Sequence, residues 1–139
     1  MSVEQKNKEF INTYTEAFWN TRDLAAFDTY FADSFVSHHA EGDKNREEFK
    51  GLCQAYFSAF PDLHIATEDL VAEGDKGTKV WTARSTHKGE FVGVPASGNK
   101  IEVKGIEVFR IDGEKVAELW VSMDALGLMQ QIGAIPAMG

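Results

Sequence analysis

The sequence predicts an α+β fold in which N-terminal helices pack on a curved, mostly antiparallel sheet. Up to about Pro61, apolar side chains recur at helical spacing. From Leu63 onward they alternate with polar ones at strand spacing, with turn signals in between. Helices followed by strands, rather than alternating with them, indicate α+β. At 139 residues, the chain has the length of one ordinary domain, so we expect a single domain over residues 1–139.

Two helices are predicted before the first strand. An apolar stripe covers roughly residues 3 to 19 and consists of Phe10, Ile11, Tyr14, Ala17 and Phe18. A shorter helix is expected from Asp23 to Phe31, and a short strand over residues 35–38 follows it. Aromatic stripes at this spacing are typical of a core rather than of a cofactor site.

A third helix is predicted just before the period changes. Asn45 and Glu48 have the spacing of a capping box, and Pro61 ends the helix. Its apolar stripe contains Phe49, Leu52, Cys53, Tyr56, Phe57 and Phe60. Within such a stripe, Cys53 is expected to be a small buried side chain.

Four strands are predicted next, at roughly residues 63–73, 77–91, 100–111 and 115–123. The pair Asp112-Gly113 predicts a two-residue hairpin turn, because a type I′ turn needs positive φ at both central positions. In the third of these strands the alternation changes phase around Gly105. We interpret this glycine as a β-bulge that curves the sheet around a pocket.

Asp124 is the leading candidate for chemistry. It is the one ionisable side chain between Leu119 and Gly139, and its neighbours are apolar. Burial raises the pKa of a carboxyl group towards the range in which it takes and returns protons. The same residue also reads as the N-cap of a short terminal helix, and the local sequence leaves both interpretations open.

The last strand has two unlike faces. Glu118, Trp120, Ser122 and Asp124 point one way, whereas Ala117, Leu119, Val121 and Met123 point the other. We expect the mixed face to line a cavity of a few hundred Å³ beneath the first and third helices. The apolar face with Leu119, Val121 and Met123 then needs another cover, which predicts a homodimer joined through this sheet face.

Composition excludes several partners. A net charge of −8 without any basic run argues against nucleic acid and against a membrane surface. No apolar run approaches the ~20 residues of a membrane span. One cysteine and a polar N-terminus favour the cytoplasm. No His or Cys pair has zinc-site spacing, so no metal is expected.

Four segments resemble the SnoaL-like polyketide cyclases, in order and spacing over about residues 35–133. They are Phe60-Pro61-Asp62-Leu63, Glu73-Gly74-Asp75, the run from Thr86 to Gly93, and Glu118-Leu119-Trp120 with Asp124 and Gln130-Gln131-Ile132-Gly133 after it. The resemblance implies the cone-shaped barrel of the nuclear transport factor 2 superfamily, usually dimeric. It also implies intramolecular aldol ring closure without metal or cofactor, with Asp124 as the acid/base.

The remaining site residues follow from what enolate chemistry needs. Besides a base, it needs a donor for the developing oxyanion in a dry pocket. His87 and His38 are the candidates for the donor or proton relay, and Trp120 for a pocket wall. Tyr14, Tyr56 and Arg84 are further candidates for contact with the substrate, expected to be a small hydrophobic molecule. Three functions stay open: an acid/base cyclase, isomerase or hydroxylase; a non-catalytic binding domain; and a structural dimer module.

Overall fold

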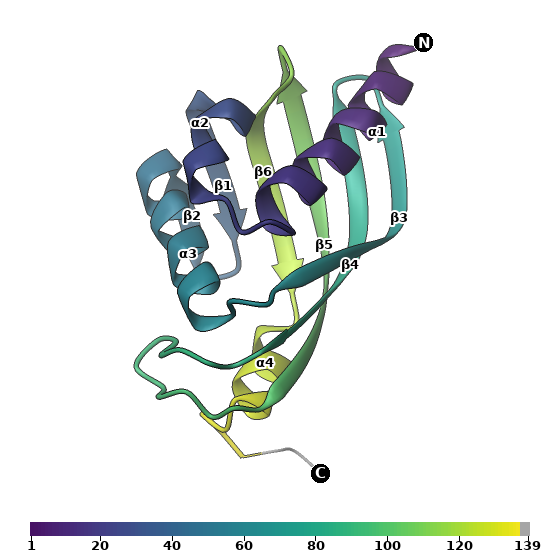
Figure 1. The fold of residues 1–139 in the computed structure, drawn as a ribbon. Coiled ribbons are helices and arrows are strands. Elements are labelled where there is room, and N and C mark those ends of the chain that lie inside the picture. The colour runs from purple at the N-terminus through teal and green to yellow at the C-terminus, as the bar shows by residue number, and fades with distance from the viewer. Residues whose placement is uncertain (137–139) are drawn as a thin grey trace.

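The computed structural model describes residues 1–136 and confirms the α+β class (Figure 1). Its α-helices are α1 (Val3–Tyr14), α2 (Phe27–Tyr30), α3 (Arg46–Ala59) and α4 (Ala125–Gln131). Its strands are β1 (Phe31–His39), β2 (Gly42–Asn45), β3 (His64–Glu73), β4 (Lys76–Thr86), β5 (Lys100–Asp112) and β6 (Lys115–Met123). None of the helices among these residues is long and apolar enough to cross a membrane.

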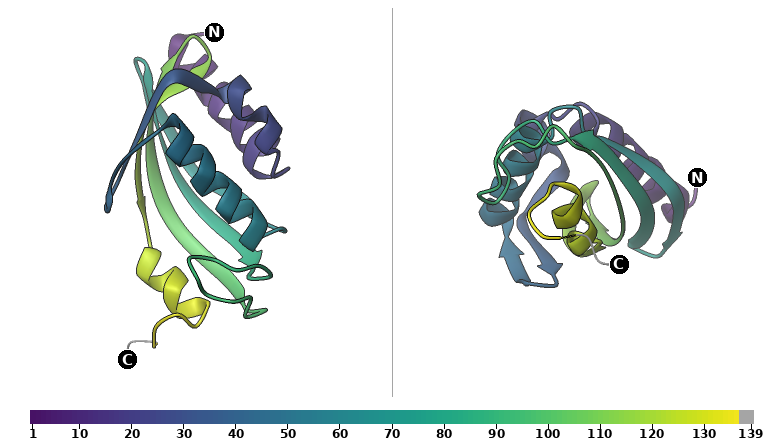
Figure 2. Two further views of the ribbon diagram at one scale, coloured as in Figure 1. Left: turned by 90° about the vertical axis from the view of Figure 1, so that its left-hand side faces the viewer. Right: turned by 90° about the horizontal axis from the view of Figure 1, so that it is seen from below.

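The six strands form one mixed sheet in the order β2-β1-β6-β5-β4-β3. All neighbours are antiparallel except β1 and β6, which run parallel. The sheet curves strongly, and α1, α2 and α3 lie on its concave side, whereas α4 lies at the open end of the cone (Figure 2). The sheet does not close, because its edge strands β2 and β3 do not pair with each other.

The capping box of the third helix is present as predicted, whereas the first two helices are less regular than predicted. The capping box of Asn45 and Glu48 is present and opens α3. The first helix loses its α geometry after Tyr14 and continues as a π-helix over Thr15–Trp19. The second predicted helix is a 3-10 turn over Leu24–Ala26 followed by the single turn of α2.

The hairpin between β5 and β6 is confirmed, but its centre lies one residue further on than predicted. Asp112 pairs with Lys115, so the two central residues are Gly113 and Glu114, with φ of 56° and 61°. These are the two positive values that a type I′ turn requires. The short strand β2 was not predicted, because Gly42–Asn45 is polar and lies at the edge of the sheet.

The predicted bulge at Gly105 is wrong. β4 and β5 pair without a register shift, and Gly105 lies opposite Trp81. The indole ring covers this glycine so closely that an added Cβ would lie 2.3 Å from Cζ2 of Trp81. Gly105 therefore makes room for a ring, and the inward phase of β5 continues through it to Glu107.

The assignment of the two faces of β6 is also wrong. Leu119 is fully buried in the core, and Val121 and Met123 line the cavity on the concave side. The homodimer itself stays a prediction. The face predicted to form it is turned inward, whereas Ile106 on the outer face of the sheet is one of the exposed large apolar side chains.

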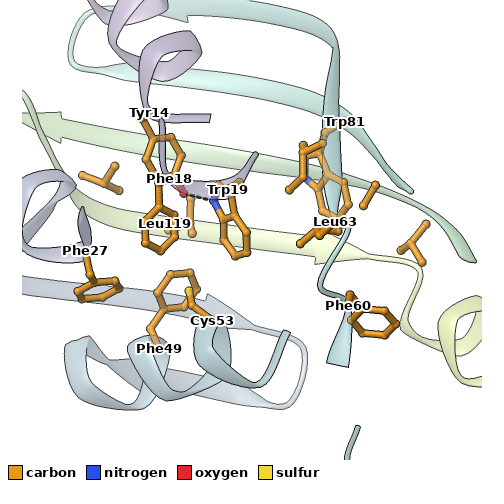
Figure 3. Close-up of a cluster of buried hydrophobic side chains, with 14 of the residues drawn as sticks. Tyr14, Phe18, Trp19, Phe27, Phe49, Cys53, Phe60, Leu63, Trp81 and Leu119 are labelled. Carbon is orange, nitrogen blue, oxygen red and sulfur yellow. Dashed lines mark hydrogen bonds between the residues drawn. The ribbon is translucent and has the colours of Figure 1, made fainter. Parts of the chain in front are cut away.

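The core is dominated by aromatic side chains between the helices and the sheet (Figure 3). Tyr14 and Phe18 stack with ring centroids 6.0 Å apart, and Phe27 stacks on Phe31 at 4.3 Å. The Nε1 of Trp19 donates a hydrogen bond to the hydroxyl of Tyr14 (2.6 Å), which satisfies this buried donor. The aromatic layer fills the space between the helices and the sheet, and its members Trp19 and Phe49 also line the cavity.

Candidate functional site

A cavity of about 80 Å³ lies between α3 and the concave face of the sheet. It is smaller than the few hundred Å³ that we expected. Its polar lining comes from Glu107, His39, Tyr56 and the two indoles of Trp19 and Trp81. Apolar side chains make up the remaining wall: Phe49, Leu52, Phe60, Leu63, Ile65, Ala83, Ile101, Val103, Val121, Met123 and Leu128.

Glu107 is the one carboxylate among the residues that line this cavity. Its Oε1 lies 3.7 Å from Nζ of Lys79 on the neighbouring strand, and the two side chains are 8% and 0% exposed. Nζ also donates to Oγ1 of Thr15 (2.9 Å), which in turn donates to the carbonyl of Ile11 (2.8 Å). Thr15 begins the π-helix, so the break in α geometry coincides with the partner of the buried ammonium.

Burial acts in opposite directions on the two charged groups. It raises the pKa of the Glu107 carboxyl, and the charge of Lys79 opposes this rise. Burial lowers the pKa of the Lys79 ammonium, and Glu107 opposes this fall. The rings of Tyr14 and Phe109, whose centroids are 5.6 and 5.4 Å from Nζ, give the ammonium further support. The pair thus places a basic carboxylate on an apolar wall.

His39 lies on the same transverse row of the sheet as this pair. Glu107 pairs with Lys79 on one side and with Val121 on the other. His38 pairs with Trp120, so the next residue, His39, lies beside Val121. Neighbouring strands are about 4.8 Å apart, which places the His39 and Glu107 backbones roughly 10 Å apart across β6. Two titratable groups therefore flank the same cavity.

The environment of His39 favours the neutral ring. Its Nε2 lies 2.8 Å from Oγ of Ser37, which is fully buried. Burial lowers the pKa of His39 below its ordinary value. At neutral pH this side chain therefore has one ring N–H to donate and one nitrogen to accept.

Asp124 is not part of this wall. Its side chain is exposed, and its Oδ1 accepts a hydrogen bond from the backbone N of Gly127 (2.8 Å) as the N-cap of α4. Gly127 allows this close approach, since a Cβ there would lie 2.2 Å from Oδ2 of Asp124. The expected burial of Asp124 is therefore wrong, whereas the alternative role as an N-cap is confirmed.

His87 and Tyr14 are buried outside the cavity wall. Nδ1 of His87 accepts from the backbone N (3.1 Å) and faces the hydroxyl (2.9 Å) of Ser97, so it secures the segment that follows β4. Its ring packs on Phe60. Tyr14 is a core residue that accepts from Trp19, and Phe18 and Phe31 surround its ring.

His38, Trp120 and Arg84 lie on the outer face of the sheet, away from the cavity. Nδ1 of His38 lies 2.8 Å from Asp43 and its Nε2 lies 2.6 Å from Glu118. These hydrogen bonds, with Glu118 first, raise the pKa of His38. The ring stacks on Trp120 at 5.3 Å. The exposed Arg84 forms an ion pair with Glu102 (2.7 Å).

Of the seven predicted site residues, the structure places Tyr56 alone on the cavity wall, with its hydroxyl 3.7 Å from Sδ of Met123. Sequence reasoning missed Glu107, Lys79, His39 and the role of Trp81. The available signal was the alternation in β5, where Glu107 shares its phase with buried apolar residues. Residues 1–136 contain no group of three or more His, Cys, Asp or Glu side chains suited to holding a metal ion.

The sequence matches the model of the SnoaL-like polyketide cyclases over residues 9–132. The chain belongs to the SnoaL-like polyketide cyclase family. None of the curated proteins matches it.

Several solved structures share this fold. AclR from Streptomyces galilaeus, described as a candidate hydroxylase, superimposes with a TM-score of 0.90 at 25% identity, covering 98% of this chain and 86% of AclR. A candidate polyketide cyclase from Acidithiobacillus ferrooxidans is 30% identical, with a TM-score of 0.80 and coverage of 95% and 97%. IdmH of Streptomyces antibioticus, also a candidate polyketide cyclase, is 29% identical, with a TM-score of 0.76 and coverage of 91% and 97%.

Proposed function

We propose that this SnoaL-like protein is an acid/base enzyme that closes a ring in a hydrophobic carbonyl compound by aldol chemistry without a cofactor. The observation that carries the proposal is the buried carboxylate of Glu107 on an otherwise largely apolar cavity wall, with His39 across β6 in the same row. Family membership supports the reaction class. Family resemblance also suggested Asp124 as the base, and the exposed position of that residue favours Glu107 instead.

In the proposed reaction, Glu107 removes a proton from the carbon next to a substrate carbonyl. The electron pair of that C–H bond passes into an enolate, whose carbon then attacks a second carbonyl carbon of the same molecule. A new C–C bond forms, and the oxygen of the attacked carbonyl, which accepts a hydrogen bond from the ring N–H of His39, takes up a proton from solvent. Glu107 releases the proton that it holds to solvent, so both groups are restored and no oxidant or reductant is needed.

The environment of each group fits its role. A raised pKa makes Glu107 a stronger base than an exposed carboxylate, whereas the charge of Lys79 favours its ionised form. A wall with few competing polar groups strengthens the interaction of an enolate with its donors. One water needs at least ~10–15 Å³, so a cavity of about 80 Å³ has the room of roughly five to eight waters and admits a compact molecule of one or two small rings.

Exchange of α-protons tests the proposal without knowledge of the natural substrate. We would incubate the protein with 2-indanone in D₂O and follow the loss of the α-proton NMR signal above the uncatalysed rate. Glu107→Gln keeps the shape but cannot take the proton, so exchange should fall by about 10² to 10⁴-fold. Asp124→Asn is the matched control and should exchange at the wild-type rate.

The two substitutions divide the alternatives. Loss of exchange in Asp124→Asn with full activity in Glu107→Gln would return the catalytic role to Asp124 and reject our assignment. Saturable binding of 2-indanone without catalysed exchange would favour the non-catalytic binding domain. Because Glu107→Gln leaves Lys79 without its counterion, the variant's folding is checked by circular dichroism, and the double variant Lys79→Met/Glu107→Gln serves where the single one unfolds.

A further inference from the structure

Trp81 presents a buried hydrogen-bond donor for which the described residues offer no partner. Its side chain lines the cavity and the residue is 6% exposed. Within residues 1–136, its Nε1 has no hydrogen-bond partner. Buried polar groups are nearly always paired, so an unpaired indole N–H on a cavity wall indicates an acceptor supplied by a ligand.

The other indole that lines the cavity, that of Trp19, has a hydrogen-bond partner within the protein. Nε1 of Trp19 donates to the hydroxyl of Tyr14, as the dashed line in Figure 3 shows. Two further unpaired buried nitrogens, Nε of Arg46 and Nε2 of His87, belong to residues that do not line the cavity. Among the described residues, Trp81 is therefore the one that brings an unpaired buried donor to this wall.

The position of Trp81 is set by the strand beside it. Its ring lies against Gly105, where a Cβ would approach Cζ2 to 2.3 Å, so the absence of a side chain at 105 lets the indole lie on β5. Glu107 comes two residues later on β5 and points to the same face. Residues related in this way across neighbouring strands are within reach of long and aromatic side chains. Trp81 and Glu107 thus line neighbouring parts of the cavity wall.

We propose that Nε1 of Trp81 donates a hydrogen bond to the carbonyl oxygen of the substrate and holds the adjacent C–H at the carboxylate of Glu107. The ligand class is a hydrophobic ketone with an acidic C–H next to its carbonyl. This inference rests on the proposed function. When Glu107 takes the proton, negative charge develops on the oxygen that Trp81 contacts, so the bond strengthens as the enolate forms. Lys79 does not replace this donor, because it bonds Thr15 and faces Glu107 outside the cavity lining.

A pair of ligands of almost the same shape tests the contact. 2-Indanone carries the carbonyl, and indane lacks it. In ¹⁵N-labelled protein, 2-indanone should displace the Trp81 indole N–H resonance, which is assigned from its loss in Trp81→Phe, more than indane does. Wild-type protein should prefer 2-indanone by about 2- to 12-fold, the range of one neutral hydrogen bond. Trp81→Phe should lose this preference.

Trp19→Phe is the matched control, because Trp19 also lines the cavity but its N–H is paired with Tyr14. It should keep the preference for the ketone. The preference is a ratio measured within each variant, so a general change in stability does not affect it. Equal affinity of wild type for the two ligands, or no displacement of the Trp81 resonance up to the solubility limit of 2-indanone, would overturn the proposal.

Failure of the proposed function looks different. If 2-indanone displaces the Trp81 resonance and is preferred over indane, but its α-protons do not exchange, Trp81 binds the carbonyl and Glu107 is not a base. If exchange proceeds with Glu107 and is unchanged in Trp81→Phe, the base is correct and the donor is not Trp81. The two measurements thus separate the two proposals.

Discussion

Replacing Lys79 by Met should destabilise the fold more than most single substitutions, because it leaves Glu107 buried without its counterion. The Lys79 side chain is 0% exposed and its Nζ lies 3.7 Å from Oε1 of Glu107, so solvent does not replace the lost ammonium beside the carboxylate. Breaking a buried ion pair by removing one partner costs about 3–5 kcal/mol. Against a usual total of ~5–15 kcal/mol, that is a large part of the free energy of unfolding.

Urea unfolding followed by tryptophan fluorescence measures this loss. The matched control is the double variant Lys79→Met/Glu107→Met, which removes both charges at similar volume. Exchange of a buried pair for apolar groups is neutral or stabilising by ~1–4 kcal/mol, so the double variant should be at least as stable as wild type. A double variant less stable than Lys79→Met would refute the reasoning.

The pH dependence gives a second check with a definite sign. The folded pKa of Glu107 is raised, so the folded state holds more protons than the unfolded state above the ordinary pKa of 4.5. Stability is therefore lost as pH rises through the folded pKa. Lys79 lowers the pKa of Glu107. Without Lys79, the pH range over which the protein loses stability therefore extends to higher pH. The deficit of Lys79→Met should thus grow from pH 5 to pH 8, and a shrinking deficit would contradict it.

Three further substitutions test other contacts. Gly105→Ala forces a Cβ against Trp81 and should lower the free energy of unfolding by about 1–3 kcal/mol. A shifted tryptophan fluorescence spectrum would show that the indole has moved. An unchanged spectrum and an unchanged unfolding midpoint would count against the packing argument. Asp124→Ala should cost about 1 kcal/mol through loss of the α4 cap, whereas Asp124→Asn should cost little, and equal losses would argue against a cap. His38 has a raised pKa, so its contribution is present below pH 6.5 and is lost as pH rises through the folded value; His38→Asn should remove that loss from the stability–pH curve.

Local chemistry predicted much of the fold. The stripe on α3, its capping box and the β5–β6 hairpin each depend on residues close in sequence, and each is present. Local sequence did not predict which face of β6 lies inside. Alternation shows that a strand has two faces, but only its neighbours decide which one is inside. The neighbours β1 and β5 decide which face of β6 is inside, and the outward Glu118 is stabilised at a partly exposed site by hydrogen bonds with His38 and Arg110.

The same limit explains the missed carboxylate. Gly105 has no side chain to reveal its face, so the sequence around it was interpreted as a change of phase. An unbroken alternation places Glu107 inside with Val103 and Phe109, and Lys79 inside between Gly77 and Trp81. A charged residue on an inward position of each of two adjacent strands predicts a buried pair. Recognition of that pair depends on the strand register, which local sequence does not give.

The parallel pairing of β1 with β6 has a consequence for synthesis of the protein. Residues 40–114, 75 in all, separate the end of β1 from the start of β6. At ~5–20 residues per second, roughly 4–15 s pass on the ribosome before the partner of β1 exists. Until then β1 and β2 form at most a two-stranded ribbon, which is marginal alone, and Phe31 and Phe35 lack the strand that joins them to the sheet. A nascent or shortened chain that stops before residue 115 should therefore need chaperone protection. His39 and Glu107 come to lie in one row of the sheet only when the final strand enters between them.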